Sequence, residues 1–246
     1  MNLWISKIKA VFLLTKFCLK LQRKDTPTRL FISVLPLLFT AFTMEYFVVR
    51  LFNLDHVPNG EISIKFLIYM LISNSIISAS RSLLNNAENL KRSRLEFWYW
   101  PVAELMLNAF IVFICLGIVQ AFHLYSPLVV VWNYFVFFCC ILLLIFVSIS
   151  VACLTAVFRD TEHLINLCTQ LLFWLSPILY SFDGLPESVQ LVLALNPFSI
   201  IFVSLAFSWG MTANISFLLS FASAMSLILL TILVSAYFKQ KIKMFL

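Results

Sequence analysis

Glycine is scarce in this chain, and its scarcity excludes one way of binding nucleotides. The chain has 246 residues but 4 glycines, which stand far apart and never in a Gly-Lys-Ser or Gly-Lys-Thr sequence. A phosphate-binding loop needs clustered glycines, because its backbone amides must approach the phosphates closely. The chain therefore lacks such a loop, and the energy for any work that it does must come from another subunit or from an ion gradient.

Patterns for metal binding and catalysis are also lacking. The three histidines, His56, His123 and His163, are scattered and do not have metal-ligand spacing. His56 and Glu61 only faintly echo the His-x4-Asp pair of acyltransferases, because Glu takes the place of Asp. We therefore expect no metal site and no catalytic residue in this chain, and an enzyme is the less favoured class.

The cysteines show no disulfide or redox motif. None of the six forms a Cys-x-x-Cys motif, and all lie in apolar or amphipathic, helix-like sequence: Cys18, Cys115, Cys139, Cys140, Cys153 and Cys168. Cysteines in such sequence behave as small hydrophobic residues. We predict that all six are free, buried thiols.

Apolar residues, in contrast, dominate the composition. Hydrophobic residues make up 62% of the chain and charged residues 11%, which is more apolar surface than a soluble domain of this size can bury. The net charge of +6 could suggest a nucleic-acid partner, but the charges sit at the ends of apolar runs. We therefore predict an integral membrane protein that binds no nucleic acid.

The apolar runs predict an all-α integral membrane fold with six transmembrane helices, because about 20 apolar residues cross a bilayer. The predicted spans are 29–52, 63–84, 101–123, 128–158, 164–181 and 211–238. The segment 182–210 is interrupted by Gly184, Pro186 and Pro197, and it is predicted to form one or two short helices that dip into the interface. Residues 1–246 are expected to form a single transmembrane domain.

The positions of Lys and Arg predict the orientation. If the N-terminus is inside, every basic residue except Arg50 and Lys65 falls in a cytoplasmic segment. Asp55, Glu61, Asp183 and Glu187 lie in the exterior segments instead. Because Lys and Arg accumulate on the cytoplasmic side of membrane proteins, both termini are predicted to be cytoplasmic.

Residues 1–25 are predicted to form an amphipathic interface helix. Trp4, Ile8 and Val11 share one face with other apolar residues, and Lys9 and Lys16 share the opposite face. A cationic helix of this kind lies flat on anionic membrane lipids. Two roles stay open: an anchor that fixes the topology, or a helix that also touches a cytosolic partner.

Two acidic residues near span ends are expected to make structural pairs or helix caps. Glu45 lies near the outer end of the first predicted span, where Arg50 could pair with it. Glu104 lies in the first turn of the third predicted span, where the helix dipole favours a negative charge.

Two cytoplasmic segments carry the remaining charged candidates. In the segment 82–98, a helical stretch at about 82–96 would project Glu88, Lys91, Arg92 and Arg94 into the cytosol. Asp160 follows Arg159 in the turn before the fifth predicted span and can cap that helix. From the residues alone, an ordinary basic loop and an ordinary cap explain these segments as well as a partner-binding site does.

Several motifs carry a resemblance to a known family. Arg159-Asp160, Ser176-Pro177, Tyr180 and Asn196-Pro197, in this order, resemble the C-terminal half of type-2 ABC exporter permeases. Within that family the chain is most similar to the transmembrane subunits that export lipid-linked polysaccharides such as O-antigens. The likeness is strongest at 158–200, and the family's Arg-Tyr pair and Leu-Gly before the first span are missing at 16–40.

The resemblance implies a partner-driven permease in the bacterial inner membrane. It implies a homodimer with two copies of a separate ABC ATP-binding subunit, which would hold the ATP and Mg. The segment 82–98 would form a coupling helix for that subunit, and the implied coupling residues are Glu88, Asn89, Lys91, Arg92, Arg94, Arg159 and Asp160. The segment 182–200 would form periplasmic re-entrant gate helices, with Pro177, Pro186, Asn196 and Pro197 as gate residues.

The implied cargo is a polyprenyl-diphosphate-linked glycan. Aromatic residues make up 16% of the chain, and pyranose C–H surfaces pack well against aromatic rings. The candidate channel residues are Phe42, Tyr46, Phe173, Trp174, Tyr180 and Phe198. Two alternatives stay open: an exporter of the same fold for a small amphiphile such as a drug or lipid, and a membrane enzyme or scaffold in glycan assembly that needs no ATPase.

Overall fold

The computed structural model describes Leu13 and residues 29–52, 59–92, 96–180, 185–209 and 215–245. Within these residues every regular element is a helix. The elements are α2 (Arg29–Phe52), α3 (Glu61–Asn85), α4 (Ala87–Arg92), α5 (Tyr99–Phe122), α6 (Pro127–Val157), α7 (Thr161–Trp174), α8 (Glu187–Ala194), α9 (Ser199–Phe207) and α10 (Ile215–Phe245). The interface helix predicted at 1–25 lies outside the described residues, apart from Leu13, which is helical and exposed.

In the described part of the chain, five helices are long and apolar enough to cross a membrane, namely α2, α3, α5, α6 and α10. They correspond to five of the six predicted spans. The segment 182–210 was predicted to form one or two short helices, and it contains α8 and α9, which meet at a bend of 108°. If that bent pair is counted as one broken span, six crossings result.

The helix of the predicted fifth span is shorter than we expected. α7 has 14 residues and ends at Trp174 instead of continuing to residue 181. At 1.5 Å per residue it is about 21 Å long, which is less than the roughly 30 Å thickness of the hydrocarbon core. The helix ends there because Pro177 cannot donate a backbone hydrogen bond and restricts the residue before it.

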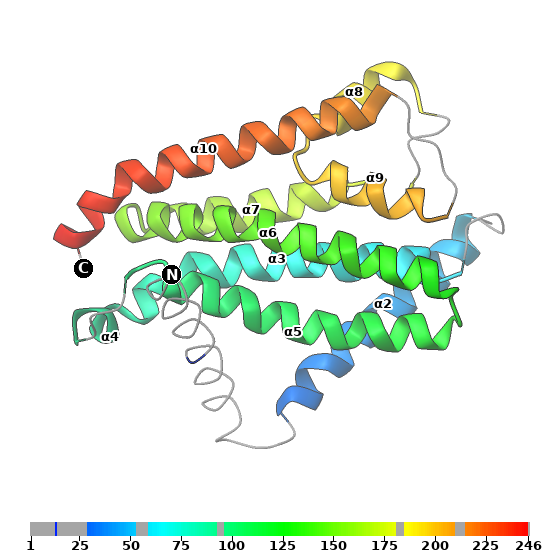
Figure 1. Cartoon of the computed structure of the whole chain (residues 1–246), viewed down its shortest axis with the longest axis horizontal. Helices are drawn as coiled ribbons and strands as arrows, with labels where there is room; N and C mark the ends of the chain where they lie inside the picture. The colour runs from blue at the N-terminus through cyan, green and yellow to red at the C-terminus, as the bar shows by residue number, and fades with distance from the viewer. Residues whose placement is uncertain are drawn as a thin grey trace.

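α3, α5, α6 and α10 run roughly along the long axis of the molecule, and α2 crosses them obliquely (Figure 1). In its most apolar stretch 72% of the residues of α3 are buried, against 11% for α2 and 17% for α10. α3 packs on α5 and α6, and α10 packs on α6. The core of the molecule is therefore built around α3, whereas α2 and α10 form its edges.

The two ends of the bundle differ in the connections that they hold. Figure 1 shows α4, the α6–α7 turn and the end of α10 at one end, which we call the α4 end. The start of α3 and the α5–α6 turn lie at the other, which we call the Gly60 end. This grouping agrees with the loops that the sequence assigns to one side of the membrane.

The cysteines are only partly as predicted. Cys115, Cys140 and Cys153 are free and buried, but Cys139 and Cys168 are free and exposed. Cys139 and Cys140 are consecutive on α6, so their side chains point in directions about 100° apart and one of them faces away from the core. Cys18 lies outside the described residues.

Candidate functional site

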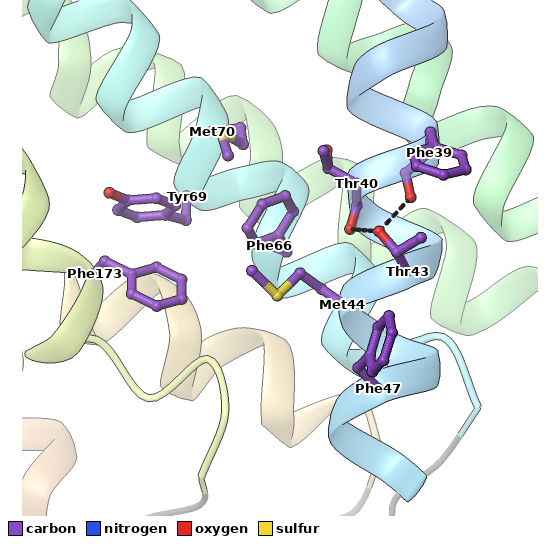
Figure 2. Close-up of a pocket in the computed structure, with 9 residues that line it drawn as sticks. All are labelled: Phe39, Thr40, Thr43, Met44, Phe47, Phe66, Tyr69, Met70 and Phe173. Atoms are coloured by element: carbon purple, nitrogen blue, oxygen red, sulfur yellow. Dashed lines mark hydrogen bonds between the residues drawn. The ribbon is translucent and has the colours of Figure 1, made fainter. Parts of the chain in front are cut away.

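An open groove with aromatic walls lies between α2, α3 and α7, and we call it the aromatic groove (Figure 2). Its volume is about 660 Å³. It is lined by Phe39, Thr40, Thr43, Met44 and Phe47 of α2, Phe66, Tyr69 and Met70 of α3, and Phe173 of α7. Two consecutive helices, α2 and α3, and the distant α7 thus contribute rings to one groove.

Edge-to-face contacts hold the α3 and α7 walls of the groove together. The ring of Phe173 lies 5.0 Å from that of Tyr69 and 6.5 Å from that of Phe66, between centroids. The Tyr69 hydroxyl donates a hydrogen bond to the Thr169 carbonyl at 2.9 Å, which ties α3 to α7 a second time. These contacts fix the ring positions, since aromatic pairs prefer such tilted geometries.

The polar atoms of α2 in the groove are already satisfied by their own helix. The Thr40 hydroxyl donates to the Pro36 carbonyl at 2.8 Å, and the Thr43 hydroxyl donates to the Phe39 carbonyl at 2.7 Å. The groove therefore offers rings, methyl groups and two thioethers. Such a surface suits the C–H faces of sugar rings or an acyl chain.

The predicted channel residues do not all lie in the groove. Phe173 lines it, and Trp174 next to it is 68% exposed. Tyr180 donates its hydroxyl to the Trp174 carbonyl at 2.8 Å, so it lies close to the end of α7. Tyr46 is exposed on α2 outside the lining set, with the Arg50 guanidinium 5.9 Å from its ring.

Phe42 and Phe198 are placed elsewhere. Phe42 packs toward α5, where its ring lies 5.2 Å from that of Phe122. Phe198 is 4% exposed and belongs to the core. The sequence reasoning missed six apolar lining residues: Phe39, Met44, Phe47, Phe66, Tyr69 and Met70. Their spacing of three or four residues along α2 and α3 was a usable signal.

At the Gly60 end, Glu45 joins α2 to the start of α3. One of its carboxylate oxygens accepts the backbone N–H of Gly60, and the other accepts the Ser63 hydroxyl. His123 at the end of α5 places its Nε2 3.7 Å from the same carboxylate. The expected pair of Glu45 with Arg50 is therefore wrong, and we call these contacts the Glu45 clamp.

The clamp requires glycine at position 60. Gly60 has φ of 85°, in the left-handed region, and a Cβ there would lie 2.2 Å from the Tyr125 hydroxyl oxygen. That hydroxyl donates to the Asn59 carbonyl. Burial and the nearby Glu45 carboxylate raise the pKa of Tyr125, so the hydroxyl keeps its proton and remains a donor.

Of the predicted gate residues, Asn196 connects the α8–α9 corner to the end of α7. Asn196 is buried, and its amide donates to the Leu175 carbonyl and to the Ser176 hydroxyl, both at 3.1 Å. Its side-chain oxygen accepts the backbone N–H of Phe198 at 3.0 Å. The Asn196-Pro197 corner is thereby tied to Leu175 and Ser176, directly before buried Pro177, whereas Pro186 is exposed at the start of α8.

The helical stretch predicted at about 82–96 is interrupted near its start. α3 continues to Asn85 and α4 begins at Ala87, since the Asn86 side chain donates back to the Ser82 carbonyl at 2.8 Å. Glu88 and Asn89 are exposed on α4. The side chains of Lys91 and Arg92, and the whole of Arg94, lie outside the described residues.

The turn before α7 connects to α3. Arg81 of α3 forms an ion pair with Glu162 of α7, with Nε and Oε1 2.7 Å apart. Arg159 and Asp160 are exposed in this turn. The Asp160 side chain makes no capping hydrogen bond, which corrects the expected cap.

Comparison with known proteins places this architecture in a family. The model of the ABC-2 type transporter family matches residues 9–208. Two O-antigen export system permease proteins RfbA of Klebsiella pneumoniae are each 26% identical to this chain over 184 residues, which is 71% of this chain and 68% of each relative. The chain therefore belongs to the ABC-2 type transporter family, and it is a multi-pass membrane subunit of an ABC transporter, a class that implies an ATP-binding partner subunit.

Proposed function

We propose that this chain is the permease subunit of an exporter that moves a lipid-linked polysaccharide out of the cytoplasm across the bacterial inner membrane. The aromatic groove is the observation that supports this cargo, because rings from three helices offer faces and edges to a ligand in it. The names of the two RfbA relatives, which are O-antigen export permeases, support the same class of cargo.

In this proposal two copies of the chain enclose the pathway. In the most apolar stretch of α2 11% of the residues are buried, so one copy leaves this wall of the groove largely uncovered. A second copy related by a two-fold axis would place another α2 and another groove across the path. The resulting passage would be lined by rings on both sides.

Two ATP-binding subunits would dock at the α4 end and drive this passage. The segment 82–98, with Glu88, Asn89 and the basic residues after them, would receive their movement. This movement would reach the groove by two routes. One is α3, which α4 follows directly, and the other is α7, because Arg81 of α3 pairs with Glu162 at the start of α7. α3 and α7, joined again at Tyr69, would then move as one wall against α2.

The outer gate would be formed by the segment 182–200. The described part of it is tied to the end of α7 by Asn196, so a shift of α7 would carry the α8–α9 corner with it. Movement started at the α4 end would thus open the far end without a separate signal.

A small amphiphile is a second candidate cargo, because the groove lining is almost entirely apolar and its threonine hydroxyls are satisfied. Such a cargo would need contact with acyl chains and little contact with sugars. This alternative leaves the transporter class unchanged. The two candidate cargoes differ in which molecule accumulates when transport stops.

The proposal is tested by deleting this chain in its native cell and analysing the lipid-linked glycans. We expect glycan to accumulate on the cytoplasmic side and to disappear from the surface, and purification of the complex to recover a soluble subunit with a phosphate-binding loop. Normal surface glycan with loss of another exported lipid would favour the small amphiphile. Recovery without any ATPase would contradict the transporter mechanism.

A further inference from the structure

A second pocket lies between α3 and α5 toward the α4 end, and we call it the polar pocket. It is lined by Asn74, Ile77, Ser78, Arg81, Ser82 and Asn85 of α3 and by Glu104 and Asn108 of α5. Its volume of about 370 Å³ falls within the roughly 300–1,000 Å³ of small-ligand sites. None of the roles considered so far uses it.

The polar pocket begins where the aromatic groove ends on α3. Met70 lines the groove, and Asn74, one turn further along the same helix, lines the polar pocket. Residues four apart lie next to each other on a helix surface. α3 therefore carries a winding stripe that is polar toward the α4 end and aromatic toward the Gly60 end.

The depth of this polar surface is unusual for a membrane helix. Asn74 lies near the middle of α3 and is exposed, and Ser78 and Asn85 continue the polar surface to the end of the helix. Polar groups inside a membrane protein face a water-filled cavity or a partner, because lipid cannot satisfy them. A recess with this lining favours water or a polar ligand over lipid, and it extends to the middle of α3.

The described charged groups of the pocket do not form an anion site. Arg81 is paired with Glu162, so its charge is largely neutralised. Glu104 has no hydrogen-bond or ion-pair partner among the described residues, and its carboxylate opens toward the pocket. The described lining therefore offers no unpaired cation that could bind a phosphate or diphosphate group.

The remaining groups match sugar hydroxyls. Asn108 donates to the Ser78 hydroxyl at 2.9 Å and keeps its side-chain oxygen as an acceptor. The lining offers planar amides, a carboxylate and hydroxyls, which accept and donate without requiring a charged ligand. Neighbouring hydroxyls of a pyranose present the same mixture of donors and acceptors.

We infer that the polar pocket binds sugar residues of the cargo as they leave the cytoplasm and passes them along α3 to the aromatic groove. This inference rests on the proposed function, because it takes the cargo to be a lipid-linked glycan. It assigns the pocket to the sugar part of the cargo and leaves the diphosphate outside it.

The test is photo-crosslinking in the native cell with the complete transporter. Asn108→p-benzoylphenylalanine should yield an adduct that stains for glycan and is destroyed by periodate. Phe110→p-benzoylphenylalanine, which is 44% exposed two residues further along the same helix, should yield no glycan adduct. A phospholipid adduct at position 108, or the absence of any adduct there, would overturn the assignment.

A third position separates this inference from the proposed function. Phe39→p-benzoylphenylalanine probes the aromatic groove. Glycan at position 39 and not at position 108 would overturn the pocket assignment and leave the function intact. Glycan at neither position would contradict the function, and the pocket assignment with it.

Two milder variants test the chemistry of the pocket by the export rate. Asn108→Leu removes the side-chain acceptor oxygen and the donor NH2 group, and it should lower export about tenfold with normal amounts of folded protein. Glu104→Gln removes any charge but keeps a polar side chain of the same size with one acceptor oxygen, so export should change by less than about twofold. A loss of export in Glu104→Gln as large as in Asn108→Leu would indicate a cationic ligand and overturn the inference.

Discussion

α2 and α3 are almost equally hydropathic, but one lies at the edge of the bundle and the other in its core. Their mean hydropathies are 1.8 and 1.6, whereas the buried share of the same stretches is 11% and 72%. The hydropathy of a segment indicates that both helices are removed from water. It does not report whether lipid or protein replaces the water, because lipid tails are as apolar as leucine.

This difference in burial corresponds to different roles of the two helices. α3 is fixed on α5, α6 and α7 and presents its polar and aromatic stripe from a rigid support. The described interhelical polar contacts of α2 lie chiefly at the Gly60 end, through the Glu45 clamp and the hydrogen bond from Ser63 to the Ala41 carbonyl. α2 is thus anchored at one end and, in our account, pivots there when the groove opens.

The largest effect is expected where α3 begins. Gly60→Ala places a methyl group against Tyr125 and Ala in the left-handed region, and it should lower the free energy of unfolding by about 3 kcal/mol. Gly117→Ala is the matched control, because its Cβ would lie 3.1 Å from the end of the Tyr134 side chain and Ala favours the helix. Reversible unfolding in mixed detergent micelles measures both, and equal stabilities would contradict the strained role of Gly60.

A pair of leucines compares the two helices directly. Leu67→Ala in α3 removes a fully buried side chain and should cost about 2 kcal/mol, at the low end for a cavity because lipid also solvates leucine. Leu35→Ala in α2, where the side chain is 54% exposed, should cost less than about 0.5 kcal/mol. The same unfolding assay applies. Similar costs at the two positions would mean that α2 is packed as firmly as α3.

The Glu45 clamp should contribute less to the free energy of unfolding than the buried side chains of α3 do. Glu45→Gln weakens the charge-assisted hydrogen bonds to Gly60 and Ser63, which should cost about 1–2 kcal/mol. We expect hydrogen exchange to rise in α2 and to stay unchanged in α3. Arg50→Gln, which removes an exposed cation, serves as the control and should leave exchange unaltered in both helices.

The smallest effect is expected at the ion pair of the α4 end. Arg81 and Glu162 are 51% and 28% exposed, so solvent screens their attraction. A double-mutant cycle of Arg81→Gln and Glu162→Gln should give a coupling free energy of about 0.5 kcal/mol. The same variants should reduce export more than stability if the pair transmits movement from α4. A coupling above about 2 kcal/mol would show instead that the pair holds the fold together.

The sequence predicted the membrane class and most of the spans, because long apolar runs have few other structures available. It misjudged α7, where the Ser176-Pro177 pair ends the helix although the apolar run continues. It also misjudged residues whose partner lies on another helix. Glu45 was paired with a neighbour on its own helix, whereas its contacts are Gly60 and Ser63 across the bundle.

The candidate site was predicted less well than the fold. A choice of rings by residue type found Phe173 but also Phe198, which is in the core. The polar pocket was missed because Asn74, Ser78 and Asn108 look unremarkable one at a time, and only their meeting across α3 and α5 makes a recess. Tertiary proximity of this kind is absent from a single sequence.

The most direct test of the account is the rate of ATP-driven glycan export through the reconstituted complex when rings of the aromatic groove are removed. Phe66→Leu, together with Phe173→Leu, should reduce export at least about tenfold, because sugar rings pack less favourably on leucine than on an aromatic face. The matched variant Phe110→Leu, on an exposed face of α5, should export at the normal rate. Equal export by the groove variants, the control and the unaltered protein would contradict the claim that the aromatic groove is the path of the cargo.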